Sequence, residues 1–224
     1  MNAAPSPPWL LALHSSSDTL GVGLQPLAAA GEDPPPARLA AFPLGRGLAN
    51  SLLECVESLL PAGQWHQLGR LAVATGPGGF TGTRLTVVLA RTLAQQLDLP
   101  LDGVGSFLLI AHRLGPDAAA AGPYWLVQDL PRRGLVAGLY GPAPAGEGAV
   151  GELLAPRLYR LEQDLLQAQR EAGLSRAERR VAEPRLPDDV AALLALAQAA
   201  AAAGRTAPWQ PVLPQYPTSP VAVD

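Results

Sequence analysis

The chain has 224 residues, a formal net charge of −3 and a single cysteine, so it is long enough for a filled core in one large or two small domains. All sixteen basic residues are arginines, which excludes a lysine Schiff base, a phosphate-binding lysine and a Ser-Lys dyad. One cysteine excludes an internal disulfide, and three scattered histidines, His14, His66 and His112, do not have zinc-ligand spacing.

No apolar run approaches the roughly twenty residues that cross a bilayer. The opening MNAAPSPPW has neither a basic segment nor a long apolar stretch, which argues against an export signal. The small net charge gives no basic stripe that would favour direct nucleic-acid binding by this chain alone. We therefore expect a soluble cytoplasmic protein.

The first predicted element is a strand at Trp9 to Leu13, continued by LALHSSSDTLGVGLQPL as a β-hairpin. Its turn is polar, Ser15 to Asp18, and small and apolar residues alternate on the return strand. The turn has two functional interpretations, a phosphate loop and a serine nucleophile with His14 as its base. Neither is favoured, because adjacent hydroxyls in a hairpin turn usually bond local backbone and no third group is evident to orient the base.

A third strand is predicted at Arg38 to Leu44, and a helix from about Ala49 to Leu60. Pro61 and Gly63 end that helix. Its apolar residues recur at helical spacing and predict one buried face, extended sideways by two further leucines. The predicted face is Leu48, Leu52, Cys55, Val56 and Leu59, with Leu53 and Leu60 beside it.

The segment from 71 to 97 predicts a buried strand, a glycine-rich turn and a long helix. Gly76, Pro77, Gly78 and Gly79 end the strand, since proline lacks an N–H and glycine offers nothing to pack. Thr81 is predicted to cap the helix that follows.

Two stripes of this helix lack charge, which predicts that it is covered on two sides. The core stripe is predicted to contain Leu85, Val88, Leu89, Thr92, Leu93 and Gln96. The second stripe, predicted to meet another helix of this chain or of a partner, is Val87, Ala90, Ala94 and the stem of Arg91.

The glycine turn, formed by Gly76, Gly78, Gly79 and Gly82, has a structural and a phosphate-binding interpretation. The Walker pattern fails, because Gly82 is followed by Thr83 and Arg84 rather than by lysine and a hydroxyl residue. The dinucleotide fingerprint fails as well, for want of an acidic residue at the end of a second strand. A structural turn is therefore favoured over a phosphate cradle.

The second half of the chain predicts paired strands at 123–130 and 133–140, a loop at 141–152 and helices at 158–172 and 188–203. Asp188 or Asp189 suits the start of the last helix and Gly204 its end. The proline-rich tail that follows cannot be helical. We predict a mixed α/β sheet in an N-terminal subdomain at 9–108 and a reduced C-terminal subdomain at 109–224.

Four segments, in order, resemble one family. TGPGGFTGTRLTVVLARTLAQQL is similar to the GPGSFTGxRxGxxxAxGLA segment of the TsaB subunits, also called YeaZ, which support threonylcarbamoyladenosine synthesis on tRNA. LALHSSSDTLGVGL resembles the family's opening LAIDTSTxxxSVAL, PRRGLVAGLY its DARRGEVYxxxY hairpin, and LPQYPTSPVA its terminal PxYLRxPxA. His14 departs from the pattern, since the family's first strand ends in aspartate.

The resemblance implies an actin/Hsp70-like (ASKHA) α/β fold with a reduced second subdomain, and a non-catalytic scaffold or dimerization subunit that binds the catalytic TsaD protein. It implies no cofactor on this chain, because nucleotide and metal are expected on TsaD, and it implies that the ATPase TsaE and tRNA join through the complex. The two predicted helices would pack against equivalent helices of TsaD. The residues expected at that contact are Leu52, Leu53, Val56, Leu60, Val87, Ala90, Arg91 and Ala94.

Two alternatives remain from the residues themselves. An enzyme of the same fold, either glycoprotease-like or sugar-kinase-like, would need an HxxxH helix or a phosphate-loop aspartate, and the sequence offers neither. A self-associating homodimer would use the same two helices as the scaffold and stays open.

Overall fold

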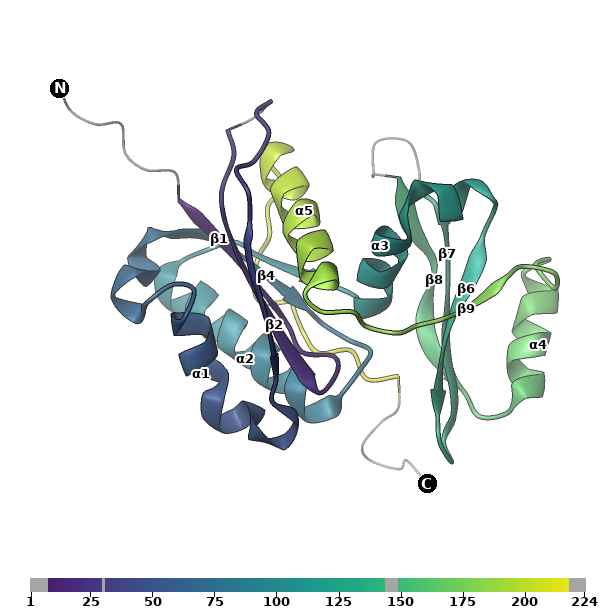
Figure 1. The fold of residues 1–224 in the computed structure, drawn as a ribbon. Helices are drawn as coiled ribbons and strands as arrows, with labels where there is room; N and C mark the ends of the chain where they lie inside the picture. Colours follow the sequence, from purple (N-terminus) through teal and green to yellow (C-terminus); the bar gives the residue numbers. More distant parts are fainter. Residues whose placement is uncertain (1–7, 30, 144–148, 218–224) are drawn as a thin grey trace. The chain divides into compact units, whose positions relative to one another are not determined.

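The computed structural model describes residues 8–29, 31–143 and 149–217 (Figure 1). These residues form two compact units. Unit 1 contains the chain up to Gly105 together with Arg185–Pro214, and unit 2 contains Ser106–Pro184 with the described residues after 214. The predicted division at 108/109 differs from this, because the chain returns to unit 1 for its last helix. Parts of the proline-rich opening, the predicted loop at 141–152 and the proline-rich tail lie outside the described residues.

Unit 1 is built on a five-stranded mixed sheet with the strand order β3-β2-β1-β4-β5. β1 is antiparallel to β2 and parallel to β4, β2 is antiparallel to β3, and β4 is parallel to β5. This confirms the predicted mixed sheet and the strands predicted in the first hairpin, at Arg38 to Leu44 and before the glycine turn. The strands are β1 (Trp9–His14), β2 (Thr19–Pro26), β3 (Arg38–Pro43), β4 (Leu68–Ala74) and β5 (Leu101–Val104).

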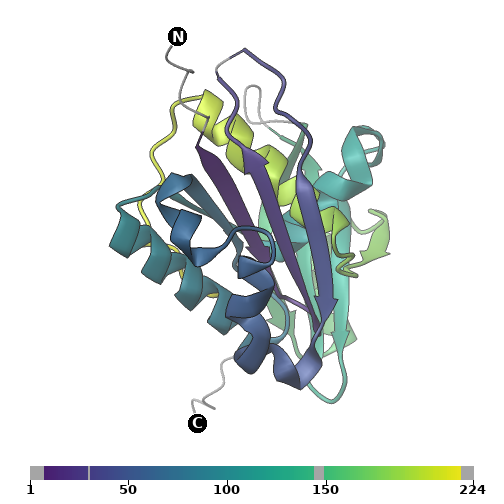
Figure 2. The ribbon, with the colours of Figure 1, turned by 60° about the vertical axis from the view of Figure 1, so that its left-hand side comes forward.

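Helices cover both faces of this sheet (Figures 1 and 2). α1 (Leu48–Glu57) and α2 (Phe80–Leu97) lie side by side on one face, and α5 (Asp188–Ala202) crosses the other. The short 3-10 helices η1 (Gly45–Gly47) and η2 (Ala62–Gln67) flank α1. Unit 1 is therefore a three-layer α/β/α arrangement.

Side-chain alternation along the strands assigns residues to the two helical layers. Leu11 and Leu13 of β1 join the core formed with α1 and α2. On the opposite face, a Cβ added to Gly23 of β2 would lie 2.6 Å from Val190 and 2.9 Å from Leu194 of α5. Because glycine has no side chain, α5 can approach the sheet closely there.

Unit 2 has a four-stranded sheet in the order β8-β7-β6-β9. β6, β7 and β8 are antiparallel, and β9 pairs parallel to β6. Neighbouring residues of β6 face opposite cores: Tyr124 packs with Phe107 of α3, and Trp125 with Leu165 of α4. The elements are α3 (Ser106–Ala120), β6 (Tyr124–Leu130), β7 (Gly134–Pro142), β8 (Val150–Tyr159), α4 (Glu162–Glu171) and β9 (Arg179–Val181).

The sequence predicted this half less well than the first. The paired strands at 123–130 and 133–140 are confirmed as β6 and β7, and the helix at 188–203 as α5. Helix α3 was not anticipated, and a break at Gly115 and Pro116 interrupts its pattern. The predicted loop at 141–152 was wrong at its end, since β8 begins at Val150.

The predicted start of a helix at 158 was also wrong, because β8 continues to Tyr159. Helix α4 begins only at Glu162. The carboxylate of Asp164 accepts a hydrogen bond of 3.0 Å from the backbone N–H of Leu161, which caps the helix at this point. The start of α4 is therefore set by this capping hydrogen bond, whereas the spacing of apolar residues had predicted a start four residues earlier, at 158.

Candidate functional site

Helix α1 buries the face that its spacing predicted. Leu48, Leu52, Cys55 and Val56 all lie in the core of unit 1, with at most 8% exposure. Leu52, Val56 and Leu60 were expected at a partner contact, but they pack inside this chain, so that assignment was wrong for these three. Leu53, on the outer side of α1, is 50% exposed.

Helix α2 buries the stripe that was predicted to face outward, and of the predicted core stripe only Leu93 is fully buried, at 6% exposure. Val87, Ala90 and Ala94 were predicted to face a partner, yet they are at most 1% exposed and belong to the core. Val88, predicted to be in the core, is 52% exposed. The physical reason is that small side chains let α2 lie close against β4. The bulkier residues Leu85 and Leu89 are left half-buried at the margin.

Arg91 also has an intramolecular role in place of the predicted partner contact. Its guanidinium donates to the backbone oxygens of Gln210, at 3.1 Å, and Val212, at 2.6 Å. It also lies 5.3 Å from the ring centroid of Trp209, a cation–π distance. Val212 is buried in the core of unit 1. Arg91 therefore fastens the segment after α5 to α2.

The outward side of the two helices carries an apolar surface. We call it the α1–α2 outer face and define it as Leu53, Phe80, Leu85, Val88 and Leu89. Leu53, Phe80 and Val88 are 50%, 42% and 52% exposed. Both helices lie in one layer, as Figure 2 shows. A group of large exposed apolar side chains on adjacent elements is typical of a protein-interaction surface.

The glycine turn is packed tightly against the β1–β2 hairpin. Gly76 has a φ of 98°, a conformation that side chains other than glycine rarely adopt. A Cβ added at Gly78 would lie 2.7 Å from the Cα of Ser16 and still closer to the Cβ and the carbonyl oxygen of the same residue. The N–H of Gly79 donates to the carbonyl of Ser16 at 2.8 Å. These contacts support the structural interpretation of the turn.

Two details of the turn differ from expectation. Helix α2 begins at Phe80 with Gly79 at its N-cap, and no side chain caps it, so the predicted cap at Thr81 was wrong. Gly82 lies inside the first turn of the helix, where an added Cβ would be 2.5 Å from the Oγ of Ser15. The absence of a side chain at Gly82 therefore lets the hairpin turn approach the helix.

A hollow of about 360 Å³ lies beside the turn. Arg46 of η1 and Asp18 of the hairpin bring opposite charges to it. Its lining residues are Ser17, Asp18, Gly45, Arg46, Leu48, Ala49, Gly79, Phe80, Thr81 and Gly82. No sequence motif indicated Arg46, because it lies in the segment before α1 and not in the glycine turn.

His14 ends β1 as a fully buried imidazole. Its Nδ1 accepts a hydrogen bond of 3.4 Å from the backbone N–H of Ser16. Burial lowers the pKa of His14 to about 4, so the ring is neutral at physiological pH. The nitrogen that a base would offer is thus engaged by backbone, which does not support the serine-nucleophile interpretation. Within the described residues no group of three or more His, Cys, Asp or Glu side chains is placed to hold a metal ion.

Comparisons with known proteins cover different parts of the chain. A family model described as TsaD, tRNA N6-adenosine threonylcarbamoyltransferase, matches residues 45–129. The tRNA threonylcarbamoyladenosine biosynthesis protein TsaB of Bacillus subtilis (strain 168) is 35% identical over 104 residues, which is 46% of this chain and 43% of that protein. The matched segment thus spans less than half the length of this relative.

Two solved structures from Pseudomonas aeruginosa resemble the chain over nearly its whole length. An uncharacterized protein with similarity to peptidase YEAZ has a TM-score of 0.66 and 20% identity, covering 94% of this chain and 100% of its own. YeaZ has a TM-score of 0.63 and 19% identity, covering 93% and 99%. With the mixed sheet and its packed helices, these likenesses identify an α/β protein of the actin/Hsp70-like fold class. Within that class, the comparisons agree with the TsaB/YeaZ family and confirm the resemblance seen in the sequence motifs.

In the part of the chain that the structure describes, none of the helices combines the length and apolarity needed to cross a bilayer.

Proposed function

We propose that this chain is a non-catalytic scaffold subunit for the formation of threonylcarbamoyladenosine at adenosine 37 of ANN-decoding tRNAs, and that it binds and activates the catalytic TsaD subunit. The proposal includes a cytoplasmic location, with TsaE and tRNA joining through the complex and with nucleotide and metal held by TsaD. It is supported by the relative named for threonylcarbamoyladenosine biosynthesis and by the TsaD family model.

The observation that carries the proposal is the α1–α2 outer face. Leu53 and Val88 expose about half of their surface on neighbouring helices, although the same helices fill their inner sides with core residues. A helical surface of this kind suits an apolar helix pair of a partner, which would bury these side chains. The proposed contact contains Leu53, which the sequence also predicted, together with Phe80, Leu85, Val88 and Leu89. The other residues predicted from the sequence are buried in unit 1 or, in the case of Arg91, bonded to the segment after α5.

The non-catalytic part of the proposal rests on the first hairpin. The family's first strand ends in aspartate, whereas this chain has a buried, neutral His14 whose Nδ1 is occupied by backbone. A neutral imidazole cannot supply the negative charge of a carboxylate. The N–H of Gly79, which a phosphate bound at the start of α2 would need, already donates to the carbonyl of Ser16.

The test is a set of charge insertions in the outer face. Leu53→Glu and Val88→Glu should leave the circular dichroism spectrum unchanged, because both positions are exposed. Each should weaken binding to TsaD more than tenfold, since loss of a central apolar contact costs about 2 kcal/mol or more. Threonylcarbamoyladenosine formation with TsaD and TsaE added should fall in parallel.

Matched controls come from unit 2, where Val181 is 78% and Leu166 of α4 is 41% exposed. Val181→Glu and Leu166→Glu make the same chemical changes outside unit 1 and should retain wild-type binding to TsaD. Full TsaD binding by both outer-face variants would refute the proposed contact. A mass measurement showing a homodimer that TsaD does not dissociate would favour the self-associating alternative. Turnover of ATP or peptide by the isolated chain would favour an enzyme.

A further inference from the structure

Four exposed arginines lie at one end of the unit 2 sheet. We call them the arginine cluster: Arg132 and Arg133 in the β6–β7 turn, and Arg157 and Arg160 at the end of β8. In the described part of the chain, none of the four forms a salt bridge. Arg157 donates to the hydroxyl of Tyr159 at 2.9 Å, an uncharged partner that leaves its positive charge uncompensated.

The fold, and not the sequence order, brings these residues together. Leu135 of β7 pairs with Tyr159 of β8, so the turn before β7 lies next to the end of β8. Gly134 has a φ of 112°, and a Cβ there would lie 2.9 Å from the Cα of Arg160 and nearer still to the carbonyl of Tyr159. The glycine thus lets Arg133 pass directly alongside Arg160.

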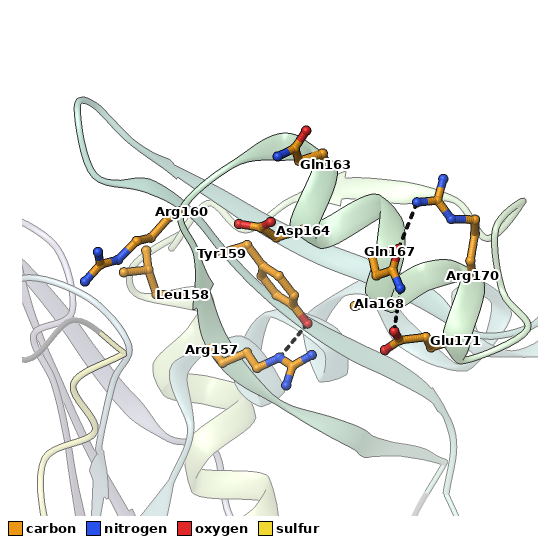
Figure 3. A pocket seen from close by; sticks show the side chains of 10 residues that line it. All are labelled: Arg157, Leu158, Tyr159, Arg160, Gln163, Asp164, Gln167, Ala168, Arg170 and Glu171. Atoms are coloured by element: carbon orange, nitrogen blue, oxygen red, sulfur yellow. Dashed lines mark hydrogen bonds between the residues drawn. The ribbon is translucent and has the colours of Figure 1, made fainter.

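A hollow of about 670 Å³ adjoins the cluster between the end of β8 and α4 (Figure 3). Arg157 and Arg160 line it together with Arg170 of α4. Two carboxylates also line it, and each already accepts a hydrogen bond: Asp164 from the backbone N–H of Leu161, and Glu171 from the side chain of Gln167. The arginines therefore outnumber the carboxylates around this hollow.

The directions of the arginines indicate the shape of the ligand. In Figure 3 the guanidinium groups of Arg157, Arg160 and Arg170 point to different sides of the hollow and do not converge on one point. A single small anion would engage only one of them, whereas the phosphates of a nucleic-acid strand are spread along its length. Guanidinium also matches phosphate geometry through two parallel N–H groups.

We infer that the arginine cluster binds the sugar-phosphate backbone of RNA, and that in the complex this RNA is the tRNA substrate. The inference rests on the proposed function for the identity of the RNA. The chain as a whole carries a net charge of −3, so the attraction is local to this end of unit 2. Contacts of this kind position the nucleic acid and do not read its base sequence.

The decisive variant is Arg133→Glu/Arg160→Glu. Both side chains are exposed, and the structure shows no side-chain partner for either within the described residues, so the fold should be kept. The control, Arg176→Glu/Arg205→Glu, changes the net charge equally at exposed positions outside the cluster. The probe is a fluorescent, unmodified transcript of an ANN-decoding tRNA, titrated at several salt concentrations with the complex of this chain, TsaD and TsaE, and at low salt with this chain alone.

We expect the cluster variant to bind the transcript at least tenfold more weakly, with a salt dependence reduced by about two phosphate contacts, while the control matches wild type. TsaD binding, measured without RNA, should be unchanged in both variants. A wild-type Kd and salt slope in the cluster variant would overturn the inference. The inference would also be overturned if the cluster variant lost binding to polyglutamate but kept its RNA binding. That result would indicate that the arginine cluster binds an acidic protein. If the chain does not bind TsaD, the proposed function fails, and the difference between variants for the isolated chain still decides RNA binding.

Discussion

The glycine turn offers a paired test of how closely the first hairpin and α2 are packed. We predict that Gly78→Ala destabilises the protein, whereas Gly79→Ala does not. At Gly78 a Cβ would overlap the backbone of Ser16, with its Cα only 2.7 Å away. At Gly79 the nearest atom would be the carbonyl oxygen of Ser16 at 3.8 Å, an ordinary contact. The two substitutions thus add the same methyl group and differ only in the space available to it.

The magnitude follows from which atoms must move. Overpacking costs about 1–3 kcal/mol, and the upper part of this range applies at Gly78, because backbone atoms cannot rotate away as a side chain does. Loss of chain entropy in the unfolded state returns about 0.4–1 kcal/mol for any Gly→Ala change. The net expectation is about 2 kcal/mol for Gly78→Ala, or about 4–8 °C in Tm for a chain of this size. For Gly79→Ala it is within about 1 kcal/mol of zero.

Thermal and urea unfolding followed by circular dichroism would measure both variants against wild type. Equal Tm values for Gly78→Ala and wild type would refute the close packing of the turn on Ser16. An equally large loss for Gly79→Ala would show that the turn as a whole, and not the contact at Gly78, requires glycine.

Two further predictions concern unit 1. Ala90→Glu should prevent folding, because its carboxylate would be buried in the core, whereas Val88→Glu should fold because that position is exposed. Circular dichroism would distinguish the two variants. A folded Ala90→Glu variant would indicate that the stripe containing Ala90 faces outward, as the sequence predicted. The pKa of His14 lies near 4 in the folded protein against 6.5 unfolded, so below pH 6.5 the unfolded state binds a proton that the folded state does not, and stability is lost as the pH falls towards 4. Between pH 7 and pH 4.5 the loss from this group should be about 2 kcal/mol, measured by urea titration at both pH values. His14→Asn should remove most of this loss, and an unchanged pH dependence in that variant would contradict the burial of a neutral imidazole.

Local patterns predicted most elements of unit 1. Alternating residues defined the β1–β2 hairpin, and proline with glycine defined the break between β4 and α2. Unit 2 was harder, because β8 has few alternating apolar residues and its exposed positions lie on a sheet edge. The start of α4 depends on one hydrogen bond from Asp164, which apolar spacing does not report.

The sequence by itself determined the mixed α/β class, the order of the first strands and helices, the glycine turn and the family resemblance, because these depend on local spacing and on contiguous motifs. Tertiary structure alone decided which stripe of α2 is buried. The two predicted stripes have the same helical periodicity, and only the packing of α2 against β4 buries Val87, Ala90 and Ala94, together with Leu93 from the other stripe. Tertiary structure also returned α5 to unit 1 and joined residues 132–133 to residues 157–160 in one basic surface, since strand pairing links segments that the chain keeps apart.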